Sequence, residues 1–453
     1  MHAGSDIPVY ITYIFAALLA LMVISLALEE KLHAKKSLIT GLAALVSLFL
    51  SVLLLPHSGK SHGHMPFYIP YVDWEVVLII LGSSLFVDVV SKGGIFSWIA
   101  VKLTKLSGGD LTRLLINYSI LTVVFSAVLN NVTAMIIIGS LSAVSLKKLN
   151  QGKYLLGFLI IEGLLTNVGG LLTLISSVPN IIVGQKAGIS FVQFFLHAAP
   201  YVLVAVAATI FAGKIMYKIP RLSSPREKEE SSALLASFDE NEGIPSRPYF
   251  YFSWFLFAAL IFLFSAQSVL PVFKDLGLGF IAVGMALVAL VRYKHDVDRN
   301  YRALDWDLLF FFVFLFIVIG VMEHAGVLKM LGGALTYLMK LPGPFDSQSI
   351  LFGAAFASSV TDNIPLSAVL ANIMGAPGLE PKATHWWAVI FGCNLGGNIT
   401  PIGSASTVVA VTIIHKNELR LSFLQFVRAA LPFALLQLIL AGGYLFILGL
   451  IKN

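Results

Sequence analysis

Two polar stretches interrupt segments of the chain that are otherwise apolar enough to lie in a lipid bilayer. They are TNVGGLLTLISSVPN, residues 166–180, and CNLGGNITPIGSAST, residues 393–407. Each contains an Asn and a Gly-Gly pair, and a Gly lowers helix stability by about 1 kcal/mol relative to Ala. We therefore expect a helix that breaks in each stretch, the first at Asn167. Unwound backbone in a membrane must be buried in protein or line a cavity, because lipid cannot satisfy its N–H and C=O groups.

The composition indicates a polytopic membrane protein in a lipid bilayer. Hydrophobic residues form 58% of the 453-residue chain and charged residues 12%, whereas soluble domains carry about 25% charged residues. The net charge of +6 is typical of Lys- and Arg-bearing cytoplasmic loops and does not indicate a nucleic-acid partner. The single cysteine, Cys393, excludes an internal disulfide. No basic run precedes the first apolar stretch, so we interpret it as a span rather than a cleaved signal peptide.

Two similar halves are visible in the sequence. The motif VDWE, residues 72–75, aligns with LDWD, residues 304–307, at an offset of 232, and Asp73 and Asp305 are expected to cap their spans. The same offset places Asn130 on Asp362, while the two interrupted stretches align at an offset of 227. Matching broken helices in two halves are typical of secondary transporters. We expect an N-terminal repeat over residues 1–220, a linker over 221–248 and a C-terminal repeat over 249–453.

Each repeat is predicted to hold five full spans and one re-entrant helical hairpin, ten spans in all. The hairpins cover residues 114–146 and 349–373, with NNVT and TDNIP at their tips, and the broken helices cover 154–183 and 386–414. An odd number of spans gives the repeats opposite orientations. With the N-terminus outside and the linker in the cytoplasm, 23 of the 30 Lys and Arg residues, Lys36 among them, fall in inner loops, in agreement with the positive-inside rule.

The hairpin tips and broken helices supply the predicted binding residues for substrate and ion. We expect each tip to meet the broken helix of its own half, so that one cluster forms in each half. Helix N-termini at the breaks favour an anion, and unwound carbonyls with side-chain oxygens favour Na⁺. The predicted residues of the first half are Asn130, Asn131, Thr133, Thr166, Asn167, Gly169, Gly170 and Thr173. Those of the second half are Thr361, Asp362, Asn363, Asn394, Gly396, Gly397, Asn398 and Thr400.

A structural role is the alternative for the Asn and Thr side chains, which can cap the broken helices and hold them together. This alternative is strongest for the outer threonines, Thr173 and Thr400.

Two carboxylates are candidates for coupling to an ion or a proton. An ionisable group within a membrane is costly and is a functional hypothesis by default. Asp362 lies at the second hairpin tip, where a cap of the turn is the alternative role. Glu162 lies about one helical turn before the first predicted break, where a structural hydrogen bond to a neighbouring helix is the alternative.

The motifs LNNVTA, TNVGG with a following PN, SSVTDNIP and NLGGNITPIGSAS resemble those of the ion transporter superfamily. The resemblance is greatest to the branch of arsenite permeases and the melanosomal P protein, with citrate and dicarboxylate transporters more distant. It covers the chain from about Asp73 onward and implies substrate and cation sites at the tips and breaks, a match of Glu162 to a family carboxylate, and a homodimer. The P-protein pattern has Asp at Asn130 and Ser177, so the first half has lost two acidic groups.

The sequence thus predicts a secondary active transporter in the cell (inner) membrane that moves a small ion by alternating access. An inorganic or carboxylate anion is the favoured substrate and Na⁺ or H⁺ the coupling ion, with no other cofactor or metal expected. A Na⁺/H⁺ antiporter and an ion channel are the alternatives. An intramembrane enzyme is disfavoured, because the chain contains no HExxH motif and a symmetric repeat has no use in a one-site enzyme.

Overall fold

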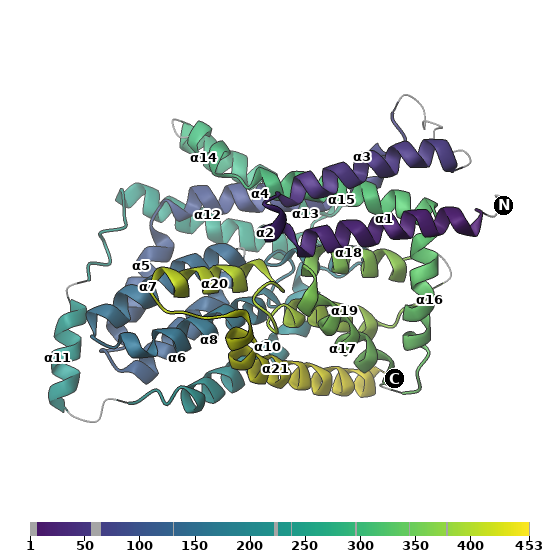
Figure 1. Ribbon diagram of the computed structural model, residues 1–453. Helices are drawn as coiled ribbons and strands as arrows, with labels where there is room; N and C mark the ends of the chain where they lie inside the picture. The colour runs from purple at the N-terminus through teal and green to yellow at the C-terminus, as the bar shows by residue number, and fades with distance from the viewer. Residues whose placement is uncertain are drawn as a thin grey trace.

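The computed structural model describes residues 7–55, 65–129, 131–221, 225–236, 238–294, 297–343, 345–376 and 379–452. Helices dominate these segments (Figure 1), which confirms the predicted all-α class. The first ten helices are α1 (Val9–Ala27), α2 (Glu29–Leu32), α3 (Lys36–Leu54), α4 (Trp74–Ser91), α5 (Ile95–Leu106), α6 (Leu111–Ser126), α7 (Asn131–Lys148), α8 (Leu155–Gly170), α9 (Val178–Lys186) and α10 (Phe191–Met216), with 3₁₀ turns at Ile69–Tyr71 and Gly152–Tyr154. The others are α11 (Pro225–Ala236), α12 (Arg247–Ala266), α13 (Pro271–Arg292), α14 (Val297–Ala303), α15 (Trp306–His324), α16 (Val327–Met339), α17 (Phe345–Val360), α18 (Asn363–Met374), α19 (Ala383–Gly396), α20 (Ala405–Lys416) and α21 (Phe423–Lys452).

Eight helices of the described segments have the length and apolar composition needed to cross a bilayer. They are α1, α3, α4, α10, α12, α13, α15 and α21, and they lie at the eight continuous spans expected from the sequence. The other two expected spans are the broken helices. Their pieces α8, α9, α19 and α20 have 16, 9, 14 and 12 residues, so each piece is shorter than the ~20 residues that a span needs.

The helices form two layers, one above the other in Figure 1. The upper group, which we call the span layer, contains α1, α3, α4, α12, α13 and α15, and its central pairs are α4 with α13 and α3 with α15. The lower group, the hairpin layer, contains α6 to α10 and α17 to α21. Helices α5 and α16 stand at opposite ends of the molecule and contact both layers.

Acidic side chains at the two aligned DW motifs fix helix starts in the span layer. Asp73 and Asp305 cap α4 and α15 by accepting hydrogen bonds from the amides of Val76 and Leu308 at 3.2 and 3.0 Å. These contacts confirm the predicted caps, in which a carboxylate satisfies an amide of the first helical turn.

The second acid of each motif binds a helix of the other half. Glu75 Oε1 accepts from the amide of Gly279 at 2.9 Å, and Asp307 Oδ1 accepts from Ser37 Oγ at 2.5 Å. Gly277 beside Glu75 has a φ of +79°, a conformation that favours glycine. Matched carboxylates therefore join α4 to α13 and α15 to α3.

Glycines of the two Gly-Gly pairs allow close packing between helices. A Cβ at Gly169 would lie 2.7 Å from Val123 Cα, and one at Gly396 would lie 2.3 Å from the carbonyl oxygen of Ala355. The absence of side chains here therefore lets α8 approach α6 and α19 approach α17.

The first helix break lies later than predicted. Helix α8 continues through Asn167 to Gly170, and the chain is not helical again until Val178. The predicted break at Asn167 is wrong, because close packing against α6 offsets the low helix propensity of the glycines. The helix ends where side chains replace its next hydrogen bonds: Ser176 Oγ and Asn180 Nδ2 donate to the carbonyl of Gly170 at 2.5 and 2.6 Å.

We expect Gly396→Ala to destabilise the protein and Gly353→Ala, on the facing helix α17, to leave its stability unchanged or slightly raised. A Cβ at position 396 meets backbone, whereas one at 353 meets no atom within 4 Å. Overpacking costs about 1–3 kcal/mol, so the melting temperature of the purified protein in detergent falls by several degrees for Gly396→Ala alone. Equal melting temperatures for the two variants would contradict this packing.

Candidate functional site

Two helical hairpins carry polar tips within the hairpin layer. Helices α6 and α7 form the first, and α17 and α18 form the second, whose tip is residues 361–362. Asn130 of the first tip lies outside the described residues. Its neighbour Asn131 donates from Nδ2 to Asn167 Oδ1 at 3.1 Å and accepts from Ser126 Oγ at 2.7 Å. A Cβ at Gly170 would lie 2.7 Å from Asn131 Oδ1, so the absence of a side chain at Gly170 makes room for the tip. The first tip therefore meets the broken helix of its own half, as expected.

The two broken helices also bind each other across the centre of the molecule. Asn167 Nδ2 donates to Asn398 Oδ1 at 2.8 Å, and Asn394 Nδ2 donates to Asn180 Oδ1 at 2.9 Å. The clusters expected in the two halves are therefore joined into one. The reason is that the broken helices exchange their second pieces: α20 packs against α7 and α8, and α9 packs against α18 and α19.

Serines at the starts of the two second pieces take part in this exchange. Ser177 Oγ, before α9, donates to Asn394 Oδ1 at 2.7 Å, and Ser404 Oγ, before α20, accepts from Asn167 Nδ2 at 2.9 Å. Neither serine was predicted as a site residue, although both occupy N-cap positions, where Ser is a common signal for a helix start.

Thr173 and Thr400 attach the breaks to the hairpins. Thr173 Oγ1 donates to the carbonyl of Ala127 and Thr400 Oγ1 to that of Ser359, both at 2.5 Å. Both hydroxyls thus satisfy carbonyls next to the hairpin tips, which is the structural alternative considered for these two residues.

Four carboxamides form a head-to-tail relay across the site. Asn131 donates to Asn167 and Asn167 to Asn398; Asn398 Nδ2 then donates to Gln437 Oε1 at 2.8 Å. The relay ends where Gln437 Nε2 donates to Thr209 Oγ1 at 3.0 Å. Apart from Asn131, its members have no exposed surface. Gln437 was not predicted from the sequence, although a carboxamide in an apolar span is a usable signal.

Glu162 of α8 is a completely buried carboxyl group with one unpaired oxygen. Its Oε1 accepts from Ser142 Oγ of α7 at 2.5 Å, while Oε2 has no hydrogen-bond partner in the described part of the chain. An uncompensated buried charge costs several kcal/mol. The arrangement therefore suits a carboxyl group that holds an exchangeable proton or receives a cation at Oε2.

Asp362 is both a helix cap and a member of an ion pair. Its Oδ1 accepts from the amide of Ile364 at 3.1 Å at the start of α18, and its Oδ2 binds the ammonium of Lys36 on α3. The exposed fractions of the Asp362 and Lys36 side chains are 14% and 23%. The cap was one of the roles predicted for Asp362. The pairing with Lys36 was not predicted, since Lys36 was counted only as a charge of an inner loop.

The remaining predicted residues lie around the same tips and breaks. Thr166 and Thr361 donate to carbonyls of their own helices. Asn363 is buried at the start of α18, Thr133 is half-buried in the first turn of α7, and Gly397 begins the second break.

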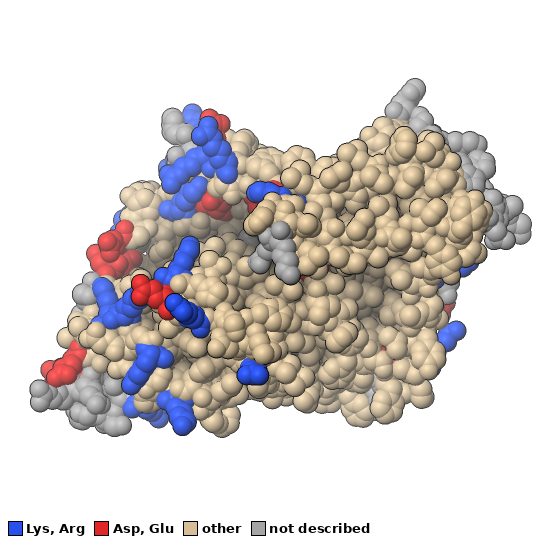
Figure 2. Space-filling model, in the orientation of Figure 1, with Lys and Arg blue, Asp and Glu red and all other residues tan. Residues whose placement is uncertain are grey.

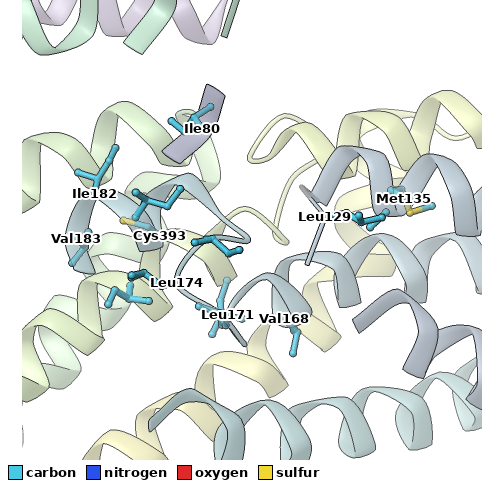
Figure 3. Close-up of a cluster of buried hydrophobic side chains, with 14 of the residues drawn as sticks. Ile80, Leu129, Met135, Val168, Leu171, Leu174, Ile182, Val183 and Cys393 are labelled. Atoms are coloured by element: carbon cyan, nitrogen blue, oxygen red, sulfur yellow. The ribbon is translucent and has the colours of Figure 1, made fainter. Parts of the chain in front are cut away.

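Apolar side chains and hydrogen bonds between residues of the chain close the centre of the site in this conformation. Figure 3 shows Val168, Leu171 and Leu174 packed beside the first break. A groove of about 390 Å³ lies between α7 and α20 and is lined by Ser140, Thr412 and their neighbours rather than by the predicted site residues. Asn167, Asn394 and Asn398, the predicted residues at the centre of the site, are completely buried in this conformation.

A family model described as "CitMHS: Citrate transporter" matches residues 26–392 of the chain. An uncharacterized transporter of Mycobacterium tuberculosis (strain ATCC 25618 / H37Rv) is 29% identical over 384 residues, which cover 83% of this chain and 86% of that protein. The P protein of Homo sapiens is 25% identical over 455 residues, 84% of this chain and 54% of that protein. These matches confirm the resemblance to the ion transporter superfamily, and they show an integral membrane transporter rather than an enzyme.

Two solved structures have a similar fold. The YdaH transporter of Alcanivorax borkumensis gives a TM-score of 0.59 at 14% identity, covering 91% of this chain and 98% of that one. MtrF of Neisseria gonorrhoeae gives a TM-score of 0.55 at 11% identity, with coverages of 91% and 95%. At these identities the similarity supports the fold alone.

We expect Gln437→Leu to destabilise the protein, because Asn398 and Thr209 then lose a hydrogen-bond partner in a dry interior. Leaving a buried polar group unsatisfied costs about 1–3 kcal/mol, and the melting temperature in detergent reports the loss. Asn398→Ala and the double variant complete a cycle. The double variant should lose less than the sum of the single variants, since both interrupt one relay; strictly additive losses would contradict the relay.

Proposed function

The chain belongs to the CitMHS citrate transporter family, and from this premise we propose that it is a secondary active transporter of a small anion, driven by Na⁺ or H⁺. The family description supports a carboxylate, and the helix N-termini at the two breaks would favour any small anion. The observation that carries the proposal is the mutual contact of two broken helices through Asn167 and Asn394. Paired discontinuous helices of this kind are where secondary transporters bind substrates and ions.

Matched contacts support the division of the chain into two repeats. Ser126 Oγ donates to the carbonyl of Thr166 and Ser358 Oγ to that of Cys393, both at 2.6 Å. These serines are related by the offset of 232 and the two acceptors by the offset of 227, which are the offsets found in the sequence. We propose that each repeat contributes one hairpin and one broken helix to a single central site.

The distribution of charge supports a cytoplasmic position for the linker. Figure 2 shows Lys and Arg side chains gathered mainly at one end of the molecule, the end at which Figure 1 places α11 and α14. Since positive charge favours the cytoplasmic side, we place residues 221–248 there and the N-terminus outside.

Alternating access requires the hairpin layer to move relative to the span layer. In the structure the predicted residues at the two breaks are buried by packing and by the amide relay, so substrate entry requires the tips or breaks to separate from their partners. Glu162 and Asp362 are the proposed coupling residues, Glu162 because its Oε2 is unpaired and Asp362 because it carries the charge of the second tip. The same two carboxylates would serve a Na⁺/H⁺ antiporter, which is the second candidate function.

We expect proteoliposomes with the wild-type protein to give anion-dependent currents that require Na⁺ or a pH gradient. Solid-supported-membrane electrophysiology measures these currents with citrate, succinate, phosphate, sulfate and arsenite, each with and without Na⁺ and across a pH step. Asp362→Asn and Glu162→Gln should abolish the cation or proton dependence, because each removes a proposed coupling carboxylate. Glu380→Gln, an exposed carboxylate between α18 and α19, is the matched control and should behave as wild type.

Other outcomes distinguish the alternatives. Currents evoked by Na⁺ and a pH step without any anion would favour the antiporter. Anion currents that persist unchanged in both variants would reject the two carboxylates as coupling residues, and the absence of current under every condition would reject the proposed activity.

A further inference from the structure

One ion pair connects the tip of the second hairpin to the span layer. The ammonium of Lys36, in the first turn of α3, binds Oδ2 of Asp362, which lies 326 positions away in the sequence. Helix α3 packs with α1 and α15 in the span layer, whereas α18 packs with α9 and α19 in the hairpin layer. The pair therefore joins two layers that alternating access must separate.

Lys36 is held in the span layer by its neighbours. The next residue, Ser37, binds Asp307 of α15 through both its amide and its hydroxyl. Glu29, in α2, places its Oε1 3.7 Å from the Lys36 ammonium. If Asp362 moves away with the hairpin, Lys36 stays with the span layer and retains Glu29 as a partner.

Asp362 has no such reserve among its described contacts. Its other hydrogen bond comes from the amide of Ile364, within its own tip. Removing one member of a largely buried ion pair leaves an uncompensated charge and is strongly unfavourable. The second hairpin can therefore leave the span layer at low cost only if another positive charge replaces Lys36 at Asp362.

The equivalent positions at the first hairpin lack both charges. The repeat partner of Asp362 is Asn130, which is uncharged. Glu75 binds Gly279 in the same way that Asp307 binds Ser37. Gly279 is therefore the repeat equivalent of Ser37, and Leu278 is the repeat equivalent of Lys36. The acid and the ammonium thus meet at the tip of the second hairpin, and both are replaced by uncharged residues at the equivalent positions of the first, as expected if they act together.

We propose that Lys36 is a tethered cation that competes with the coupling ion for Asp362. When Na⁺ or a proton occupies the Asp362 carboxylate, the Lys36 ammonium is released to Glu29 and the second hairpin is free to leave the span layer. Without the ion, Lys36 holds the hairpin in place and prevents movement of an unloaded site. The inference rests on the proposed function and gives Asp362 a specific part in it.

Cysteine labelling at the neighbouring tip residue tests this lock without a substrate. Thr361→Cys protein in nanodiscs is reacted with a maleimide in NaCl or in N-methyl-D-glucamine chloride, at neutral and at acid pH. The native Cys393 is completely buried and gives little background. Na⁺ or acid should speed the labelling of Thr361→Cys several-fold, the two conditions distinguishing the two ions. Adding Lys36→Gln should make labelling fast in the absence of either ion and unresponsive to both.

Three companion variants make the result specific. Lys36→Arg keeps the positive charge and should keep the ion response. Lys186→Gln removes another lysine that contacts α18, through Asn372 at 3.3 Å, but pairs with no acid there, and should respond as the parent. Asp362→Asn removes the charge that Lys36 neutralises, so labelling of this variant should respond neither to Na⁺ nor to acid. This variant keeps the proposal testable if Lys36→Gln fails to fold.

Two results would overturn the proposal: labelling of the parent that neither Na⁺ nor acid changes, or a folded Lys36→Gln variant that responds as the parent does. The test is separate from the transport assay. An ion response at Thr361→Cys without any anion current would support the Lys36–Asp362 lock and reject the proposed substrate class. An anion current without an ion response would support the proposed transport and reject the lock.

Discussion

Every feature of the site follows from the need to satisfy unwound backbone where lipid offers no hydrogen bonds. Each broken helix leaves carbonyl and amide groups without helical partners, and side chains from elsewhere in the fold provide them. The carbonyl of Gly170 receives Ser176 and Asn180, and the hydroxyls of Thr173 and Thr400 bind the hairpins. The breaks can exist only because the hairpins and the opposite broken helix surround them.

This requirement also makes the centre of the molecule a single network. Asn167 and Asn398 use their amide hydrogens within the protein, so any ion that binds between the broken helices must replace existing contacts. The two charged exceptions differ in kind. Glu162 is completely buried and its Oε2 has no partner among the described residues, whereas Asp362 is neutralised by Lys36. One half thus offers a site for a proton or cation, and the other half a charge that must always have a partner.

Local features of the fold could be predicted from the sequence, whereas contacts between distant segments could not. The helical class, the hairpins, the caps at Asp73 and Asp305 and the existence of two breaks leave periodic or compositional signals, and these were predicted. The position of the first break was not predicted, because the packing of Gly169 against α6 outweighs the low helix propensity of glycine. Repeat offsets show which residues are equivalent but not which ones touch, so the exchange of α9 and α20 between halves was missed. The Lys36–Asp362 pair leaves no local signal at all.

The central claim is that the hairpin layer moves against the span layer when the coupling ion binds. Pulsed electron–electron spin resonance between labels at Val291→Cys on α13 and Lys416→Cys on α20, both exposed, measures the distance between the layers. A second pair, Val291→Cys with Leu45→Cys on α3, lies within the span layer. The account predicts that Na⁺ or acid shifts the distance distribution of the first pair and leaves the second unchanged. Distributions of the first pair that stay the same in every condition would contradict it.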